Sequence, residues 1–241
     1  MKKENIVETQ IWRINGRMVV AQSVEEALVI WRAHFNGGED MELRTVERVT
    51  SKVLGALIPQ GAVPSADASA PEAHAVAAPM PAVSAIPADG VYPEEGGVRI
   101  WKNGHTFLVP KEWDKEEWPL LNEAGYERSK RSKERLMSEA DALLDWDFVA
   151  ATKHIQNLGT DIPLKEGEYM LTAPVWLAMY EHRDALNKAL RAMGAKEIDF
   201  DKDVWFAQRA NTYYAWYFVG AGRYLNHGNV SYSNQVVALS L

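Results

Sequence analysis

NTYYAWYFVGAGRYLNHGNVSYSN, residues 211–234, contains five Tyr, four Asn and a single charged side chain, Arg223. This composition does not suit a core, because each Tyr hydroxyl and Asn amide would need a buried hydrogen-bond partner. It does not suit an ordinary solvated face either, since such faces are rich in Lys and Glu. It is closest to a binding surface, where rigid aromatic rings supply contact area and Asn and Ser adapt their hydrogen bonds.

The residues around this stretch predict an α+β domain over residues 91–241. Helical spacing predicts a helix in DFVAATKHIQNL that ends at Gly159, and Pro174 suits the first turn of a helix that runs to Gly194. ERSKRSKERLMSEADALLDW is charged and helix-prone. A hairpin is expected around Asn103-Gly104, and GEYML is a short strand candidate. Further strands are expected in DVWFAQ, YAWYFV, GRYLNH, GNVSYS and QVVALSL, so that helices come first and an antiparallel sheet last.

Residues 1–57 predict a small separate module with the order ββαβ. Two strand-like runs flank Asn15-Gly16, a dipeptide that favours a tight hairpin turn. Ser23 is a candidate N-cap with Glu26 three residues later, and an apolar helical stripe follows up to Asn36-Gly37-Gly38. A last strand is expected within residues 41–50. We interpret this module as an anchor or an assembly unit.

Residues 58–90 have the composition of a linker. Residues 59–90 include eleven Ala and six Pro and no aromatic residue. Such a segment buries too little apolar surface to order itself, and its prolines keep it extended. At about 3.1 Å per residue its reach is at most roughly 100 Å. The chain is thus predicted to hold two folded parts joined by a flexible Ala/Pro tether.

Overall charge and cysteine content exclude several classes of function. The 241 residues carry a net charge of −7, whereas a protein that binds nucleic acid usually has a basic surface. There is no cysteine, which removes disulfides, thiolate catalysis and zinc–thiolate sites. The N-terminus lacks the apolar region of a secretory signal, and no run approaches the ~18 apolar residues of a membrane span. We therefore expect neither nucleic acid nor membrane insertion.

The order of segments in the C-terminal part resembles a known family. GEYMLTAPVWLAMYEHRDALNKALRAMG is followed by VWFAQRANTYYAWYFVGAG and then by RYLNHGNVSYSNQVVALSL. This order resembles an uncharacterised bacterial and phage domain family with a C-type-lectin-like fold. That family is related to the formylglycine-generating enzymes and to the variable proteins of diversity-generating retroelements. The resemblance covers roughly residues 97–241 and implies a C-type-lectin-like domain.

Individual motifs both fit and depart from the family pattern. The family's long helix ends in a run like INAALxAIGG, and DALNKALRAMG matches it; its strand motif YWSSTEYSSxNAWYV matches NTYYAWYFV. LTAPVWL stands where the family has a Leu-Pro-Ser entry, and VWFAQRAN stands where Tyr-Trp-Ser-Ser-Thr-Glu is usual. Enzymatic relatives rely on cysteines, and sugar-binding C-type lectins hold calcium through Glu-Pro-Asn, Gln-Pro-Asp and Trp-Asn-Asp motifs. None of these is present, so the resemblance implies a binding protein without catalysis or calcium.

The residues themselves give no sign of an enzyme. The six histidines are scattered and no pair has metal-ligand spacing with a carboxylate. His182 is expected to face solvent, and Trp146-Asp147 to pack and cap a helix. Gly220, Gly222 and Gly228 are interpreted as hairpin punctuation rather than as a phosphate cradle. We expect no catalytic residue, no metal and no cofactor.

The candidate ligand-binding residues lie in the tyrosine-rich stretch. They are Tyr213, Tyr214, Arg223, Tyr224, Asn226, His227, Asn229, Tyr232 and Asn234. Tyr suits sugars and protein surfaces alike, because its face can stack while its hydroxyl forms hydrogen bonds. In the alternative interpretation some rings face inward, with Trp216 and Phe218 toward the core and Tyr217 and Val219 opposite.

Together these features predict a non-enzymatic phage virion protein, a fibre or decoration protein that displays its C-terminal domain. Its expected partners are a host-surface glycan or protein for the C-terminal domain, and the virion or sister subunits for the N-terminal module. Many copies on one particle would strengthen weak contacts, so a homo-oligomer or multicopy arrangement is expected. The alternative is a structural virion module whose aromatic face is a subunit interface. A bacterial cytoplasmic or cell-surface protein is the other localisation considered.

Overall fold

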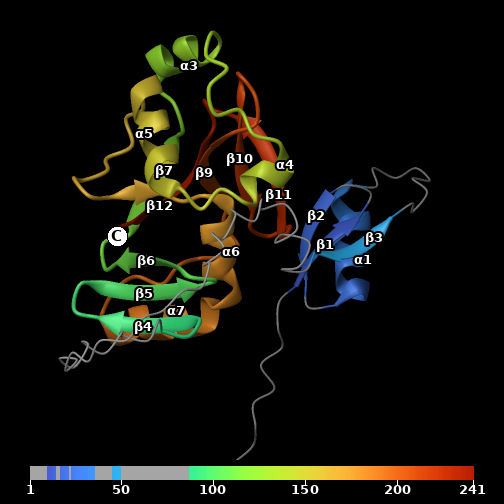
Figure 1. Ribbon diagram of the computed structural model, residues 1–241, viewed down its shortest axis with the longest axis vertical. Coiled ribbons are helices and arrows are strands. Elements are labelled where there is room, and N and C mark those ends of the chain that lie inside the picture. Colours follow the sequence, from blue (N-terminus) through green and yellow to red (C-terminus); the bar gives the residue numbers. More distant parts are fainter. Residues whose placement is uncertain (1–9, 15–16, 22, 36–44, 50–86) are drawn as a thin grey trace, which may run out of the picture.

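The computed structural model describes residues 10–14, 17–21, 23–35, 45–49 and 87–241. In these ranges the chain is α+β, as the sequence predicts (Figure 1). Three predicted features lie outside the described residues: the turn at Asn15-Gly16, the helix end at residues 36–38, and the linker 58–90 as far as residue 86.

One large sheet runs through both described parts of the chain. Its strands are β1 (Gln10–Ile14), β2 (Arg17–Ala21), β3 (Val46–Val49), β7 (Asp114–Pro119), β8 (Tyr169–Met170), β9 (Val204–Arg209), β10 (Tyr214–Val219), β11 (Tyr224–Asn229) and β12 (Ser233–Leu239). Their order is β3-β1-β2-β11-β10-β9-β12-β7, with β8 paired to β12 beside this path. The neighbours pair antiparallel, except that β12 runs parallel to β9. Since β7 precedes the helices, the expectation of helices first and sheet last is only partly right.

Four of the five strands predicted near the C-terminus are confirmed. GNVSYS is not a strand of its own, because Gly228 and Asn229 end β11 and a turn then leads to β12. That turn is closed by the Tyr232 amide, which donates to the Asn229 carbonyl (2.9 Å).

A second sheet of three antiparallel strands contains β4 (Gly90–Glu94), β5 (Gly97–Lys102) and β6 (His105–Pro110). The predicted hairpin is confirmed: Asn103 has a φ of 50° and Gly104 a φ of 79°, the positive values that a type I′ turn requires. The Asn103 amide donates to Asp89 Oδ1 (2.9 Å). The folded part therefore begins inside the last residues of the predicted linker rather than at residue 91.

Three predicted helix ends, at Ser23, Asp147 and Gly194, are confirmed. The helices are α1 (Val24–Phe35), α3 (Glu123–Ser129), α4 (Glu139–Ala142), α5 (Phe148–Leu158), α6 (Ala173–Glu181) and α7 (Arg183–Ala192). The ββαβ order of the N-terminal module is confirmed, and Ser23 Oγ accepts a hydrogen bond from the Glu26 amide (3.2 Å). Asp147 caps α5 by accepting from the Ala150 amide (2.9 Å). Gly194 follows α7 with a φ of 71°, the conformation expected just past a helix end.

Two helical predictions are corrected. The helix expected from Pro174 to Gly194 is interrupted at His182, which separates α6 from α7. Seven of the nine α6 residues are buried, and α6 packs against β10 and β5, whereas α7 packs against β4 and β5. His182 at this break is half-buried and does not face solvent freely. The charged segment 127–146 is not one helix: it contains the end of α3, the short helix α4, and turns and irregular chain between and after them.

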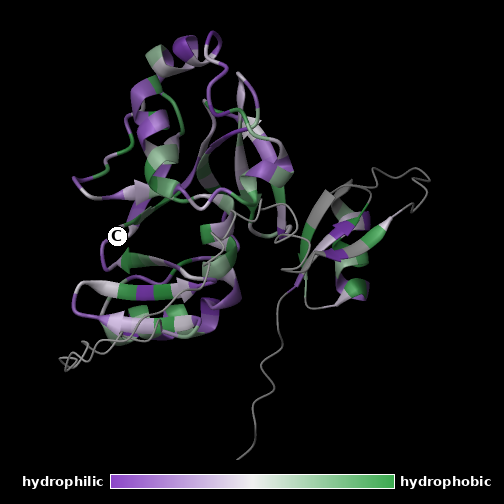
Figure 2. Ribbon diagram, in the orientation of Figure 1, coloured by the Kyte–Doolittle hydropathy of each residue, from purple (hydrophilic) through white to green (hydrophobic). Residues whose placement is uncertain are grey.

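Apolar side chains cover both faces of the large sheet. On one face Trp216 and Phe218 pack with α6 and the smaller sheet, which confirms the predicted inward side of β10. On the other face Trp205 and Ala215 pack with Ile155 of α5, and Tyr217 lies at the rim of this cluster. Figure 2 shows hydrophobic and hydrophilic residues mixed along the helices of the C-terminal part, as expected where each helix buries one side.

The loop after α3 is held by a buried guanidinium at the end of β9. Arg209 is 0% exposed, and its Nη2 donates to the carbonyls of Ser129 (2.9 Å) and Ser132 (3.1 Å). Its Nη1 lies 3.4 Å from the Glu134 carbonyl and 3.5 Å from His154 Nε2. Backbone oxygens, not a carboxylate, therefore take most of the hydrogen bonds of this cation.

Three histidines with a lowered pKa predict a loss of stability at mildly acidic pH. Burial is the main cause that lowers the pKa of His105, His154 and His182, and Arg209 lowers the pKa of His154 further. Such histidines bind more protons in the unfolded chain. Their stabilising contribution is therefore complete above the unfolded pKa of about 6.5 and is lost as the pH falls toward the lower folded values. We expect the free energy of unfolding in urea to fall as pH drops below about 6.5. His154→Gln should reduce this fall; an unchanged pH profile in the variant would contradict the assignment to His154.

The N-terminal module docks on the edge of β11, beside the C-terminal part (Figure 1). The Val20 amide donates to the Arg223 carbonyl (3.0 Å), and Val19 pairs with Tyr224. Arg223 Nη1 lies 2.6 Å from Glu26 Oε1 on α1. In this structure the module therefore extends the sheet of the C-terminal part by one hairpin and a further strand.

Reversing the charge of Arg223 is expected to weaken this docking. The pair is partly exposed, so its own contribution is about 1 kcal/mol or less, but Arg223→Glu would set two carboxylates against each other. We expect the Val20 amide to exchange its hydrogen several-fold faster in Arg223→Glu and to recover when Glu26→Arg is added. Arg191→Glu, which breaks the exposed pair with Glu197, is the control and should leave Val20 unchanged.

Candidate ligand-binding pocket

Exposed tyrosines gather at one end of the sheet, where short turns join β9 to β10 and β11 to β12. Tyr213 is 44% exposed, Tyr214 39% and Tyr232 65%, although large aromatic side chains are normally covered. The turn between β9 and β10 is fixed by Asn211, whose Oδ1 accepts hydrogen bonds from the amides of Tyr213 (2.8 Å) and Tyr214 (3.0 Å). The backbone that presents these rings is thus well defined.

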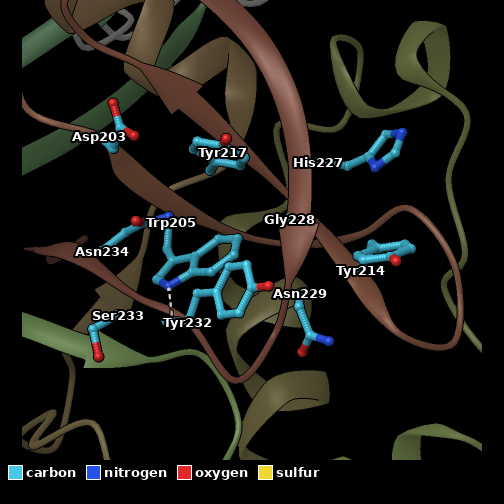
Figure 3. A pocket seen from close by; sticks show the side chains of 10 residues that line it. All are labelled: Asp203, Trp205, Tyr214, Tyr217, His227, Gly228, Asn229, Tyr232, Ser233 and Asn234. Carbon is cyan, nitrogen blue, oxygen red and sulfur yellow. Dashed lines mark hydrogen bonds between the residues drawn. The ribbon is translucent and has the colours of Figure 1, made fainter.

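A pocket of about 570 Å³ opens beside these tyrosines (Figure 3). This volume lies within the range of small-molecule sites, roughly 300–1,000 Å³. It is lined by Asp203, Trp205, Tyr214, Tyr217, His227, Gly228, Asn229, Tyr232, Ser233 and Asn234. Figure 3 shows Asp203, Trp205, Tyr217 and Asn234 on one side of the β11 ribbon at Gly228, and Tyr214 and His227 on its other side.

The floor of the pocket is aromatic and depends on a glycine. Trp205 is only 1% exposed, and its ring meets that of Tyr217 edge to face at 5.4 Å. Its Nε1 donates to the Tyr232 carbonyl (3.2 Å), which ties the floor to the exposed turn. A Cβ at Gly228 would lie 3.1 Å from Tyr217 Cε1 and 3.5 Å from Trp205 Cη2. The strand can pass over these rings because Gly228 has no side chain.

A half-buried carboxylate stands at one end of the pocket. Asp203 Oδ1 accepts a hydrogen bond from the Gly220 amide (3.1 Å). Burial raises the pKa of this carboxyl, and the hydrogen bond from Gly220 opposes that rise. Burial is also the main cause that raises the pKa of Tyr217, and the Asp203 charge adds to it. The site therefore combines a negatively charged group with aromatic walls.

Amide and imidazole groups complete the rim. The rings of Tyr214 and His227 lie 5.5 Å apart, and Trp216 meets His227 edge to face at 5.4 Å. Asn229 Oδ1 accepts hydrogen bonds from the amide (3.0 Å) and the hydroxyl (2.8 Å) of Ser231, so its orientation is fixed.

The structure brings five of the nine predicted ligand-binding residues together. The five that line the pocket are Tyr214, His227, Asn229, Tyr232 and Asn234. Tyr213 lies outside the lining, with its ring 6.4 Å from that of Tyr126.

The remaining three predicted ligand-binding residues are engaged elsewhere. Arg223 binds Glu26 of the N-terminal module, and Tyr224 pairs with β2. Asn226 lies outside the lining and donates to the Tyr217 hydroxyl (3.2 Å). They share the tyrosine-rich stretch with the pocket residues, but Arg223 and Tyr224 lie at the start of β11, beside the N-terminal module, whereas Asn229 lies at the other end of this strand.

Five lining residues were not predicted, for different reasons. They are Asp203, Trp205, Tyr217, Ser233 and Gly228. Asp203 and Trp205 come from the start of β9, which pairs with β10 and β12 only in the folded sheet. Gly228 was interpreted as turn punctuation, yet it lies within β11 opposite Ala215. An Asn-His-Gly-Asn run within an aromatic strand pattern was the signal that could have pointed to a close approach at Gly228.

In residues 10–14, 17–21, 23–35, 45–49 and 87–241 no group of three or more His, Asp or Glu side chains is placed to hold a metal ion. None of the helices in these ranges is long and apolar enough to cross a membrane.

No protein-family model, curated protein or solved structure matches this chain.

Proposed function

We propose that this chain is a non-enzymatic binding protein whose pocket at β9–β12 holds a glycan. The observation that carries the proposal is the pocket of about 570 Å³, in which tyrosine rings and a carboxylate stand beside oriented Asn and Ser side chains. Sugar rings present apolar C–H faces and a rim of hydroxyl groups. Aromatic faces suit the former, while carboxylate, amide and hydroxyl groups form hydrogen bonds with the latter.

The rim of the pocket fits a displayed ligand better than a buried substrate. Tyr232 at 65% and Tyr214 at 39% exposure can contact a molecule that approaches from solvent without any rearrangement of the core. Trp205 is covered and acts as support for the floor rather than as a contact surface in this conformation. Each site therefore offers the ligand only a small contact surface. Simultaneous binding by many copies would raise the overall affinity.

The same proposal includes a phage virion as the place of action, with host attachment as the role. It is supported by the resemblance of residues 97–241 to a C-type-lectin-like phage and bacterial family. The order of a small module, an Ala/Pro-rich segment and a larger domain adds to this support. In this proposal the N-terminal module contacts the virion or sister subunits.

A structural role is the second candidate, and the exposed aromatic rings favour it as well. Tyr213, Tyr214 and Tyr232 form a cluster of the kind that is often buried between subunits. In that case the cluster would be covered in an oligomer of this chain, and no glycan would be needed.

Changing Tyr232 to Ala separates the two candidates. For a glycan site we expect the full chain to bind members of an array of neutral, acidic and amine-bearing glycans, and Tyr232→Ala to weaken that binding about tenfold or more. Tyr92→Ala is the matched control, because Tyr92 is also exposed (38%) but lies on β4 of the smaller sheet.

Light scattering at several concentrations, on the same samples, measures the oligomeric state and so tests the structural candidate. A stable oligomer that dissociates in Tyr232→Ala, with no signal on the array, would contradict the glycan proposal and support the structural one. A chain whose mass does not change with Tyr232→Ala, but whose array signal falls, would support ligand display.

A further inference from the structure

Asp203 is a half-buried carboxylate at the edge of the pocket. Its Oδ1 accepts from the Gly220 amide (3.1 Å), and no described Lys or Arg forms an ion pair with it or lowers its pKa. The cation next to it in sequence, Lys202, turns to Glu117 instead (3.0 Å). Placing a carboxylate partly out of water without an opposite charge beside it costs free energy. A ligand that supplies a positive charge would offset this cost.

The rest of the pocket lining also favours a positive charge. Among the described residues that line it there is no Lys and no Arg. The faces of Tyr214, Tyr217 and Tyr232 carry the negative side of the ring quadrupole, which attracts cations and repels anions. An acidic sugar or a phosphate would meet both Asp203 and these faces with the wrong sign.

Amide and hydroxyl groups beside the carboxylate point to a polyhydroxylated molecule. Asn234 and Ser233 lie on the same side of β11 as Asp203 in Figure 3, at the start of β12. Both groups can donate and accept hydrogen bonds, as sugar hydroxyls require. A simple alkyl ammonium ion would leave them unused.

From these observations we infer that the pocket selects an amino sugar, a glycan with a free, protonated amine that pairs with Asp203. This rests on the proposed glycan-binding function and adds the charge of the ligand to it. The raised pKa of Asp203 agrees with a carboxylate that lacks a cation in the free protein.

The test compares three tetrasaccharides with the full chain by calorimetry: glucosamine, its N-acetylated form, and galacturonic acid. We expect the glucosamine tetramer to bind at least about tenfold more tightly than the N-acetylated one, and the acidic one to bind least. Asp203→Asn keeps an oxygen that can accept from the Gly220 amide but removes the charge. It should bring the glucosamine and N-acetylglucosamine tetramers to similar affinity.

The chain has a net charge of −7 and could attract any cationic sugar without a specific contact. A matched variant tests for this nonspecific attraction. Asp201→Asn removes the same charge two residues away, at a position outside the pocket lining. It should keep the preference for glucosamine. A preference lost equally in both variants, or kept in Asp203→Asn, would overturn the inference.

The remaining outcomes separate this inference from the proposed function. Tight binding of the neutral tetramer with no preference for the amine would overturn the amino-sugar assignment and leave the glycan site standing. A lysine octapeptide that binds as tightly as the glucosamine tetramer, and equally needs Asp203, would replace the glycan by a protein ligand. If none of the tetramers binds and the array is blank, the glycan site itself is overturned.

Discussion

Replacing Arg209 by Leu is expected to lower the free energy of unfolding by about 3–5 kcal/mol. The side chain is fully buried and donates to the carbonyls of Ser129, at the end of α3, and of Ser132 in the loop that follows, with the Glu134 carbonyl at 3.4 Å. Leu would fill part of the space but would remove the guanidinium donor from these carbonyls, of which Ser129 would keep the Ser132 amide (3.2 Å). Hydrogen bonds to a charged group contribute about 1.5–3 kcal/mol each, and the apolar surface that Leu buries offsets part of the loss of two of them. Urea unfolding monitored by tryptophan fluorescence would measure the loss.

Two variants test whether the forked shape of the guanidinium matters. Arg209→Lys keeps the charge but cannot reach several carbonyls at once, so an intermediate loss is expected. Arg191→Leu removes an exposed arginine that pairs with Glu197 and should change stability by less than about 0.5 kcal/mol. If Arg209→Leu were as stable as Arg191→Leu, the hydrogen bonds from Arg209 to backbone carbonyls would not contribute to the free energy of unfolding as expected.

The loss should begin in the loop that Arg209 holds. The Met137 amide donates to the Arg209 carbonyl (2.8 Å), and Trp216 Nε1 donates to the Met137 carbonyl (3.1 Å). The loop is thus tied to β9 and β10 at one end of the strands. In Arg209→Leu the Met137 amide should exchange its hydrogen faster than the amides of β10. This difference would show that the loop opens locally without unfolding of the whole chain.

Local signals in the sequence predicted several turns and helix ends correctly. Asn103-Gly104 has the positive φ values of its hairpin, Ser23 and Asp147 cap their helices, and Gly194 follows α7. Each of these depends on a few neighbouring residues and on backbone preferences that act alone. The alternation that turns Trp216 and Phe218 inward is equally local, because strand side chains alternate with a period of two.

The arrangement of the elements could not be predicted in the same way. Nothing near Asp203 or Trp205 indicates that the start of β9 lies beside Asn234 and Tyr232, because that contact depends on β12 returning parallel to β9. Arg223 lies in a stretch that has the composition of a binding surface, yet it binds Glu26, which is nearly two hundred residues away in the chain. Long-range pairing of this kind is set by the whole sheet rather than by any short pattern.

Gly228→Val is expected to remove ligand binding almost completely, by about 100-fold or more, while the fold is kept. A Cβ at this position already comes within 3.1 Å of Tyr217 Cε1, so two further methyl groups must occupy the pocket or displace its floor. The backbone tolerates the change, because Gly228 is not among the glycines with positive φ and β-branched residues suit a strand. Affinity for a bound glycan and the midpoint of thermal unfolding should be measured on the same samples.

Gly96→Val is the matched control for this change. Its Cβ would have only Leu108 Cδ2 nearby, at 4.0 Å, in the turn between β4 and β5 of the other sheet. Binding should therefore persist in Gly96→Val. Full binding by a folded Gly228→Val would show that the ligand does not use this pocket, and the exposed tyrosines would then belong to a flat contact surface. Lost binding in a folded Gly228→Val, with Gly96→Val unaffected, would show that recognition depends on the space that the glycine leaves open above Trp205 and Tyr217.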